Sequence, residues 1–285
     1  MNRVDPQRET RFFHPDAGVI ANLRNQIQTI ERGSGSCGSA VSNDVILPKV
    51  ISLGAPEINH ALPWNGLPAN GLHEVFGDTA ALGFSAVLLS RFSHLKSGGP
   101  VLWCHREDTL CGQGLQAFGI NPDRVIQVRG KNDTDILWAM EEGLQTPGLA
   151  AIIGAPRKIP PIAGRRLQLA AEEHGVAGIL LRLTSRYGDQ HVGFQTATSA
   201  ALTRWRVTSA PSVTPAFGVG LGPPQWNLEL QRYRLSAAQN KREGLDFYRL
   251  HDWQVEWCDE TDDLSVVNTF CDRPAEPFLF SRAAI

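Results

Sequence analysis

The feature that most constrains the fold is an alternation, from Leu72 onward, of short apolar runs with segments of helix length. The apolar runs are LHEVF at 72–76, PVLWC at 100–104, RVIQV at 124–128, LAAII at 149–153 and VAGILLRL at 176–183. Strands separated by helix-length connections form βαβ units, whose right-handed crossovers place helices over a parallel sheet. The sequence therefore predicts an α/β fold with a mostly parallel sheet covered by helices.

Beyond Leu183 the hydrophobic pattern changes. The runs RWRVTS at 204–209, WNLELQRYRL at 226–235 and DWQVEW at 252–257 alternate polar and apolar residues. Such alternation is typical of strands with one solvated face, as in antiparallel sheets. We expect a core at 49–209 and C-terminal antiparallel strands at 210–258. The last stretch, 259–285, opens with the acidic run DETDD and is expected to be a loosely ordered tail.

The N-terminal region has a different character. Within 19–32 the apolar residues recur every three or four positions, which predicts an amphipathic helix in segment 1–32; they are Ile20, Leu23, Ile27 and Ile30. A stretch rich in Gly and Ser follows and indicates a flexible linker at 33–48. The helix is thus expected to be tethered to the core.

Composition excludes several classes of protein. The 285 residues are 42% hydrophobic and 20% charged with a formal net charge of −2, which describes a globular chain without general attraction to nucleic acid. No apolar run is long enough for a membrane span, and the first residues do not resemble a secretory signal. We therefore expect a cytoplasmic protein. Its five cysteines include no CxxC pair, and we expect free thiols and no metal site.

The most informative local motif follows the first apolar run. Phosphate-binding loops place a glycine-rich turn between a strand and a helix, with a lysine that reaches the phosphates. Here the run continues through Gly77, Asp78, Gly83, Phe84 and Ser85. Phe84 stands where the lysine is required, and Asp78 brings a carboxylate to the position of the anion. We expect a degenerate loop that needs no cofactor, in which Gly77 and Gly83 form only a tight turn; the alternative is a residual nucleotide site held by backbone N–H groups.

A second part of the nucleotide machinery is also missing. A magnesium-binding carboxylate is expected at the end of a neighbouring buried strand. The run LAAII is followed by Gly154-Ala155-Pro156, which contains no acid. Glu107 and Asp108 follow another strand, but without a positioned phosphate we interpret them as solvated loop acids. The sequence therefore predicts no catalytic residues and no ATPase activity.

The segment 51–183 resembles the core of RecA, the bacterial recombinase, on the residues GLPANGLHEVFG at 66–77. Within that superfamily the chain is similar to the ImuA group. The similarity rests on the N-terminal LRNQIQTIER, the lysine-free loop and the strand pair WNLELQRYRL and DWQVEWCDE. This resemblance implies a RecA-like fold and an accessory role in SOS-induced translesion DNA synthesis and mutagenesis. The implied partners are ImuB, an inactive relative of translesion polymerases, an error-prone replicative-type polymerase, and RecA itself.

Basic and aromatic side chains supply candidate contact residues. They are expected to alternate along the C-terminal strands, where partners or DNA could meet them. The candidates are Arg204, Arg206, Trp226, Arg232, Arg234 and Trp253. A further basic group flanks Pro160-Pro161, at a place where RecA-like proteins have DNA-contacting loops: Arg157, Lys158, Arg165 and Arg166. Solvated strand faces and a tryptophan core remain the alternative interpretations.

Two other functions stay open. One is a nucleotide-dependent DNA-repair ATPase with an unusual loop, which nucleotide would stabilise by linkage. The other is a SulA-type inhibitor of cell division, which would bind the division GTPase. The long N-terminal region and the C-terminal strands go beyond what such an inhibitor needs.

Overall fold

The computed structural model describes residues 49–96, 99–106, 110–184, 199–212, 222–234 and 250–273, with side chains described up to residue 267. These residues all belong to the second of two compact units, which spans Leu47–Ile285. The expected N-terminal helix at 1–32 and the expected linker at 33–48 lie outside them. Glu107 and Asp108 also lie outside the described residues.

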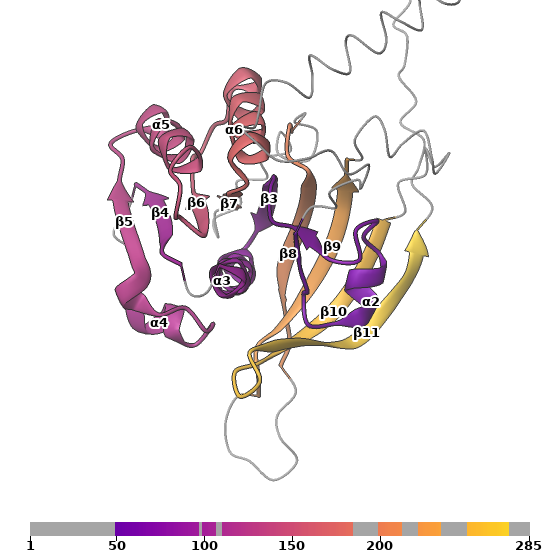
Figure 1. The fold of residues 1–285 in the computed structure, drawn as a ribbon. Coiled ribbons are helices and arrows are strands. Elements are labelled where there is room, and N and C mark those ends of the chain that lie inside the picture. Colours follow the sequence, from indigo (N-terminus) through magenta and orange to yellow (C-terminus); the bar gives the residue numbers. More distant parts are fainter. Residues whose placement is uncertain are drawn as a thin grey trace, which may run out of the picture. The chain divides into compact units, whose positions relative to one another are not determined.

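A nine-stranded sheet organises the unit, in the order β11-β10-β9-β8-β3-β7-β6-β4-β5 (Figure 1). Its first strands along the chain are β3 (Leu72–Gly77), β4 (Val101–His105), β5 (Val125–Arg129), β6 (Ala151–Gly154) and β7 (Ala177–Leu183). The later strands are β8 (Thr203–Ala210), β9 (Gln225–Tyr233), β10 (Leu250–Cys258) and β11 (Asp263–Arg273). Short elements complete the described chain: β1 (Val50–Ile51), β2 (Leu67–Pro68), α2 (Pro56–His60), α4 (Gly112–Gln116) and the 3-10 turn η1 (Pro122–Arg124).

The parallel half of the sheet confirms the predicted fold class. Strands β5, β4, β6, β7 and β3 pair in parallel. Strands β9, β10 and β11 pair antiparallel, as the alternating pattern predicts. Strand β8 was expected among the antiparallel strands, but it pairs parallel with β3 and antiparallel with β9. It therefore joins the two halves, because it pairs with a parallel strand on one side and with an antiparallel strand on the other.

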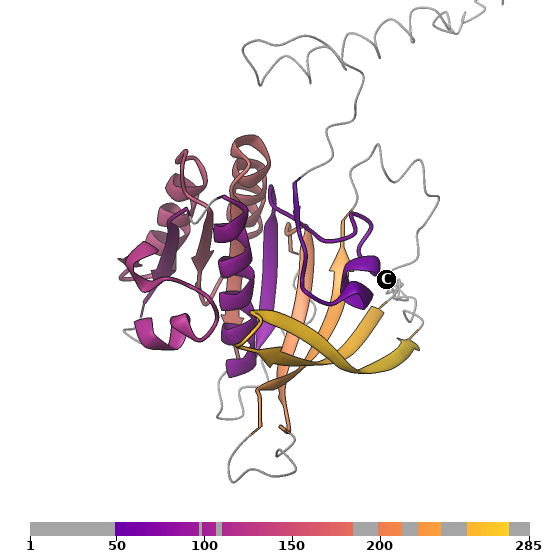
Figure 2. The same ribbon diagram turned by 60° about the horizontal axis from the view of Figure 1, so that its bottom comes forward.

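Helices cover both faces of the parallel strands. On one face lies α3 (Thr79–Leu95), and on the other lie α5 (Asp133–Leu144) and α6 (Pro161–His174) (Figures 1 and 2). Most residues of α3 are buried, because the apolar side chains of β8, β9 and β10 also pack into the cluster around it. A helix that is apolar on nearly all sides is typical of such a buried position.

Local sequence signals explain where α5 and α6 begin and end. Asn132 caps α5, since its side-chain oxygen accepts the N–H of Asp135 at 3.0 Å. Helix α6 has Pro161 in its first turn and stops at Gly175, which adopts a left-handed conformation with φ +65°.

Neither helix is long and apolar enough to cross a membrane, and the same holds for every helix among the described residues.

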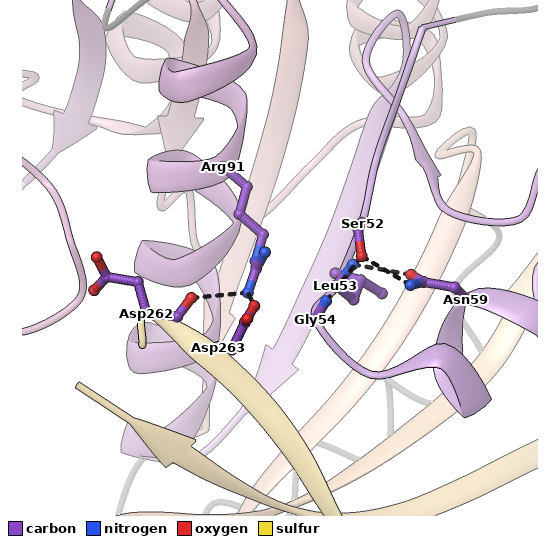
Figure 3. A network of polar contacts seen from close by, with 7 residues as sticks. All are labelled: Ser52, Leu53, Gly54, Asn59, Arg91, Asp262 and Asp263. Carbon is purple, nitrogen blue, oxygen red and sulfur yellow. Dashed lines mark hydrogen bonds and ion pairs between the residues drawn. The ribbon is translucent and has the colours of Figure 1, made fainter. Parts of the chain in front are cut away.

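The expected loose tail at 259–285 is wrong for its first part. Residues 263–273 form β11, whose alternating Leu264 and Val266 pack towards the core. The acidic run before it makes the turn from β10, with Asp262 at φ +51°. Arg91 of α3 holds this turn, because its guanidinium donates to the Asp262 carbonyl at 2.9 Å and pairs with Asp263 at 2.7 Å (Figure 3). Acids that suggest a solvated tail thus serve as anchors for a hairpin.

Candidate functional site

The turn between β3 and α3 is the place where a phosphate-binding loop would lie. Strand β3 ends at Gly77 and α3 begins at Thr79, so Asp78 alone connects them. Asp78 is the N-cap, and its carboxylate accepts the N–H of Ala80 at 2.8 Å. The same carboxylate accepts the backbone N–H of Ser209 at 2.9 Å and its hydroxyl at 3.1 Å. The positive end of α3 therefore already faces a carboxylate of the chain itself.

Gly77 is required by the close approach of β3 to β8. Its φ is +148°, and a Cβ at this position would lie 1.7 Å from the carbonyl oxygen of Val207. Its own carbonyl accepts the N–H of Thr184 at 2.7 Å and the Thr184 hydroxyl at 3.0 Å. The turn is thus enclosed by the backbone of β8 and by Thr184, the residue after β7.

The sequence alignment of the loop with a phosphate-binding motif is corrected by the structure. Gly83, Phe84 and Ser85 lie in the second turn of α3, because the cap at Asp78 starts the helix immediately after the strand. Gly83 therefore forms no part of the strand-to-helix turn. A Cβ there would lie 2.9 Å from the Trp226 ring, so its role is close packing.

The residue at the lysine position is part of the core. Phe84 is 0% exposed, and its ring centroid lies 5.7 Å from that of Trp205. Ser85 is equally buried, and its hydroxyl donates to the Ala81 carbonyl at 2.7 Å within the helix. Neither side chain points to a ligand site.

The end of β6 lacks the magnesium-binding acid that a nucleotide site needs. The strand passes into Ala155 and Pro156, and Ala155 donates its N–H to the Cys104 carbonyl at 3.1 Å. The carboxylate of Asp133 in α5 has a structural role beside this segment, since it accepts the backbone N–H groups of Arg157 at 3.0 Å and Lys158 at 3.1 Å. Within the described residues, no group of three or more His, Cys, Asp or Glu side chains could hold a metal ion.

Among the basic residues near Pro160, most side chains face solvent. Arg157, Lys158, Arg165 and Arg166 are exposed, and Arg166 pairs with Glu141 of α5 at 2.6 Å. Their contact with DNA stays a prediction.

The candidate contact residues separate into buried and exposed sets. Trp226 and Trp253 are only 5% and 2% exposed and belong to the core around α3, so they offer no docking surface. Arg204 is also buried, which corrects its expected place on a solvated face. Arg206 is exposed and pairs with Glu229 at 3.3 Å. Of the six, Arg206 and Arg234 are exposed, and Arg232 is half-buried.

Arg232 and Arg234 contact the backbone of the segment just before β8. Arg232 donates to the carbonyl of Ser199, and Arg234 donates to the carbonyl of Ala200 at 3.1 Å. Each therefore has a structural role at the start of the stretch before β8. Arg206 contacts the side chain of Glu229 on the exposed face of the sheet, and it remains a candidate contact residue.

Sequence reasoning missed the buried carboxylate that explains Arg204. Glu74 of β3 is 1% exposed; Arg182 of β7 lies 3.1 Å and Arg204 of β8 lies 3.6 Å from its oxygens. The Arg204 guanidinium also stacks 4.9 Å above the Phe76 ring. A carboxylate within an apolar strand was the available signal, because charged residues are buried only when paired.

A second buried polar residue is His73, which is 0% exposed. Its Nε2 donates to the Pro68 carbonyl at 2.9 Å, because a carbonyl can only accept. Its Nδ1 then accepts the Thr203 hydroxyl at 2.8 Å, and the Thr203 oxygen receives the Trp205 indole N–H at 2.9 Å. Burial lowers the pKa of His73 from 6.5 to about 4. The imidazole is thus neutral and joins β3 to β8.

This histidine makes folding stability depend on pH. As pH falls from 6.5 to 4, the unfolded chain takes up a proton at His73 and the folded chain does not. The free energy of unfolding should therefore fall by about 3 kcal/mol across that window, and His73 should contribute no pH dependence above it. Urea unfolding of the wild type and His73→Gln at several pH values measures the difference. The exposed His60→Gln is the control; a His73→Gln slope equal to that of the wild type would contradict the assignment.

Comparison with known proteins shows which family the chain belongs to. No family model matches it. It is 38% identical over 194 residues to Protein ImuA of Caulobacter vibrioides strain NA1000 / CB15N, and equally to that of strain ATCC 19089 / CIP 103742 / CB 15. Each match covers 65% of this chain and 79% of the relative.

Among solved structures, a KaiC-like protein from Pyrococcus horikoshii OT3 aligns with a TM-score of 0.48 and 13% identity, over 78% of this chain and 100% of that chain. The sheet itself, mostly parallel and covered by helices with an antiparallel extension, has the α/β architecture predicted from the sequence. With 38% identity across 79% of its curated relatives, the chain belongs to the ImuA family.

Proposed function

We propose that this chain is a cytoplasmic, nucleotide-independent accessory protein of damage-induced mutagenesis that acts through protein contacts. The observation that carries the proposal is the turn after β3, where the Asp78 carboxylate caps α3 and binds Ser209. A nucleotide phosphate at the same place would have to displace this carboxylate or lie against it, and like charges at hydrogen-bond distance repel strongly. Membership of the ImuA family supports the connection with mutagenesis.

The core position of Phe84 supports the same proposal. A lysine that reaches the β and γ phosphates needs to stand at the start of the helix, whereas Phe84 is fully buried one turn further on. Recovery of a phosphate site would require both a new helix start and a new core. We therefore propose that the RecA-like fold serves as a scaffold for partners. These are the translesion polymerase components of the SOS response, namely an ImuB-like protein and an error-prone replicative-type polymerase, and RecA.

The test is capture of purified ImuB-like protein by the full chain with no nucleotide, with ATP and Mg²⁺, and with ADP and Mg²⁺. We expect equal capture in the three conditions. In parallel, a strain that lacks the gene should lose ultraviolet-induced mutation and regain it with the wild-type gene. Capture that requires ATP would favour the alternative of a nucleotide-dependent repair ATPase. Capture of the division GTPase instead, with normal mutation in the deletion strain, would favour the SulA-type alternative.

A further inference from the structure

The outer face of helices α5 and α6 carries large apolar side chains that the fold does not bury. Trp138 is 64% exposed, Ile162 is 78% exposed and Leu169 is 50% exposed. The two helices lie side by side over the parallel strands (Figure 1), and an ion pair of 2.6 Å joins Glu141 of α5 to Arg166 of α6. Trp138 lies one turn from Glu141, and both Ile162 and Leu169 lie one turn from Arg166. The three apolar side chains therefore gather around one ion pair.

The inward faces of both helices already account for their attachment to the sheet. Ile136 and Met140 of α5, and Leu167 and Ala171 of α6, belong to the core cluster with β4, β6 and β7. Trp138 and Leu169 project from the opposite sides of their helices. Contiguous exposed apolar groups that include a tryptophan are typical of protein interfaces.

The charges that flank Leu169 are arranged symmetrically. Arg165 lies four residues before Leu169, and Glu173 lies four residues after it; all three are exposed. Because a helix turns about 100° per residue, each of the two charged residues lies about 40° around the helix from Leu169, one on either side. Along the helix axis, each lies about 6 Å from Leu169, in opposite directions. When a two-fold axis at Leu169 relates two antiparallel copies of α6, Arg165 of one copy comes to the same height along the helix pair as Glu173 of the second copy, within reach of these long side chains, and the reverse. The next pair, Arg166 and Glu172, is related by the same axis.

This charge order does not serve the isolated helix. The helix dipole favours acids in the first turn and bases in the last turn. Helix α6 has no acid in its first turn, and Glu172 and Glu173 stand near its C-terminus, where His174 is the base of the last turn. In an antiparallel pair of helices, each acidic end meets the basic end of its neighbour, so the unfavourable order becomes a favourable one.

We infer that the full chain forms a two-fold symmetric dimer through α6, with Leu169 at the axis and with Trp138 and Ile162 at the edges of the contact. The interface is isologous, since the same residues serve both copies. The antiparallel α6 helices pack at about 8–10 Å between axes, the usual distance for helix pairs. Partner proteins would then meet a bivalent scaffold.

The test is the mass of the full chain by light scattering and sedimentation between about 1 and 200 µM, the range in which interfaces of modest size associate. We expect a shift with concentration from the monomer mass of 31.2 kDa to twice that value. Leu169→Glu should weaken dimerisation by at least about tenfold, because it places two carboxylates at the axis. A mass that stays at 31.2 kDa throughout the range overturns the inference.

Charge reversal tests the geometry itself. Arg165→Glu and Glu173→Arg each place like charges opposite one another at both symmetry-related contacts, so each variant should be monomeric. The double variant restores opposite charges and should dimerise again. A mixture of the two single variants should also form a dimer, because every Glu of one then faces an Arg of the other.

The matched control is Arg124→Glu, the same reversal at an exposed residue of η1 away from α6, which should dimerise like the wild type. Thermal melts check that each variant is folded, as exposed substitutions should leave stability nearly unchanged. Dimerisation of the single variants at wild-type concentration would assign association to another part of the chain. That result, or a mixture that remains monomeric, overturns the inference.

Discussion

Replacement of Phe84 by lysine should unfold the protein and should not create a nucleotide site. The side chain is fully buried against Trp205 in the cluster around α3, far from solvent. Loss of the aromatic packing alone costs about 3–5 kcal/mol, and burial of an unpaired ammonium adds to that cost. Together these approach the whole stability of a typical domain, about 5–15 kcal/mol. Urea unfolding followed by tryptophan fluorescence, and the yield of soluble protein, measure the effect.

Two variants define what the result means. Phe84→Leu keeps an apolar side chain and should lose less than the lysine variant, about 1–3 kcal/mol. Leu95→Lys makes the same chemical change at the end of the same helix, where the side chain is 38% exposed, and should remain folded. A stable Phe84→Lys protein that melts at a higher temperature with ATP would show that this position can serve a nucleotide after all.

Gly77→Ala should be the most damaging glycine substitution in the turn after β3. A methyl group would lie 1.7 Å from the Val207 carbonyl oxygen, and that oxygen belongs to backbone that cannot rotate away. The φ of +148° adds strain for any residue with a Cβ. We expect the free energy of unfolding to fall by about 3–5 kcal/mol, as for severe overpacking with backbone strain.

Gly175→Ala separates the steric part from the conformational part. Gly175 ends α6 at φ +65°, and a Cβ there would meet no atom within 4 Å. Its loss should be only about 1 kcal/mol, the cost of the left-handed conformation. Equal losses for the two variants, in the same urea titration, would mean that β8 shifts to accommodate a side chain at Gly77.

The sequence was sufficient for the central parallel strands β3, β4, β6 and β7 because each is a short apolar run that is largely buried on both faces, which leaves a local signature. It was insufficient for the start of α3. A glycine-rich segment followed by an apolar helix fits either a phosphate loop or an immediate N-cap, and the choice depends on Ser209, which comes from a distant strand and binds Asp78. Spacing along the chain carries no information about that partner.

Non-local pairing also explains the two corrections on the C-terminal side. Arg204 looked solvated because it alternates with Trp205, but its face is set by Glu74 of β3. The acidic run 259–263 looked like a tail because its anchor, Arg91, lies on α3. The alternation of Leu264 and Val266 was a local sign of β11, although a short one.

The N-terminus of α3 holds the Asp78 carboxylate where a nucleotide-binding protein holds phosphate. A thermal melt of the purified full chain, with and without millimolar ATP and Mg²⁺, shows whether nucleotide still binds there. The melting temperature should be the same in both conditions, because Asp78 excludes the phosphate. A melting temperature that rises with ATP concentration would contradict it, since saturation at a hundredfold excess over Kd adds about 2.7 kcal/mol to the stability of the folded state.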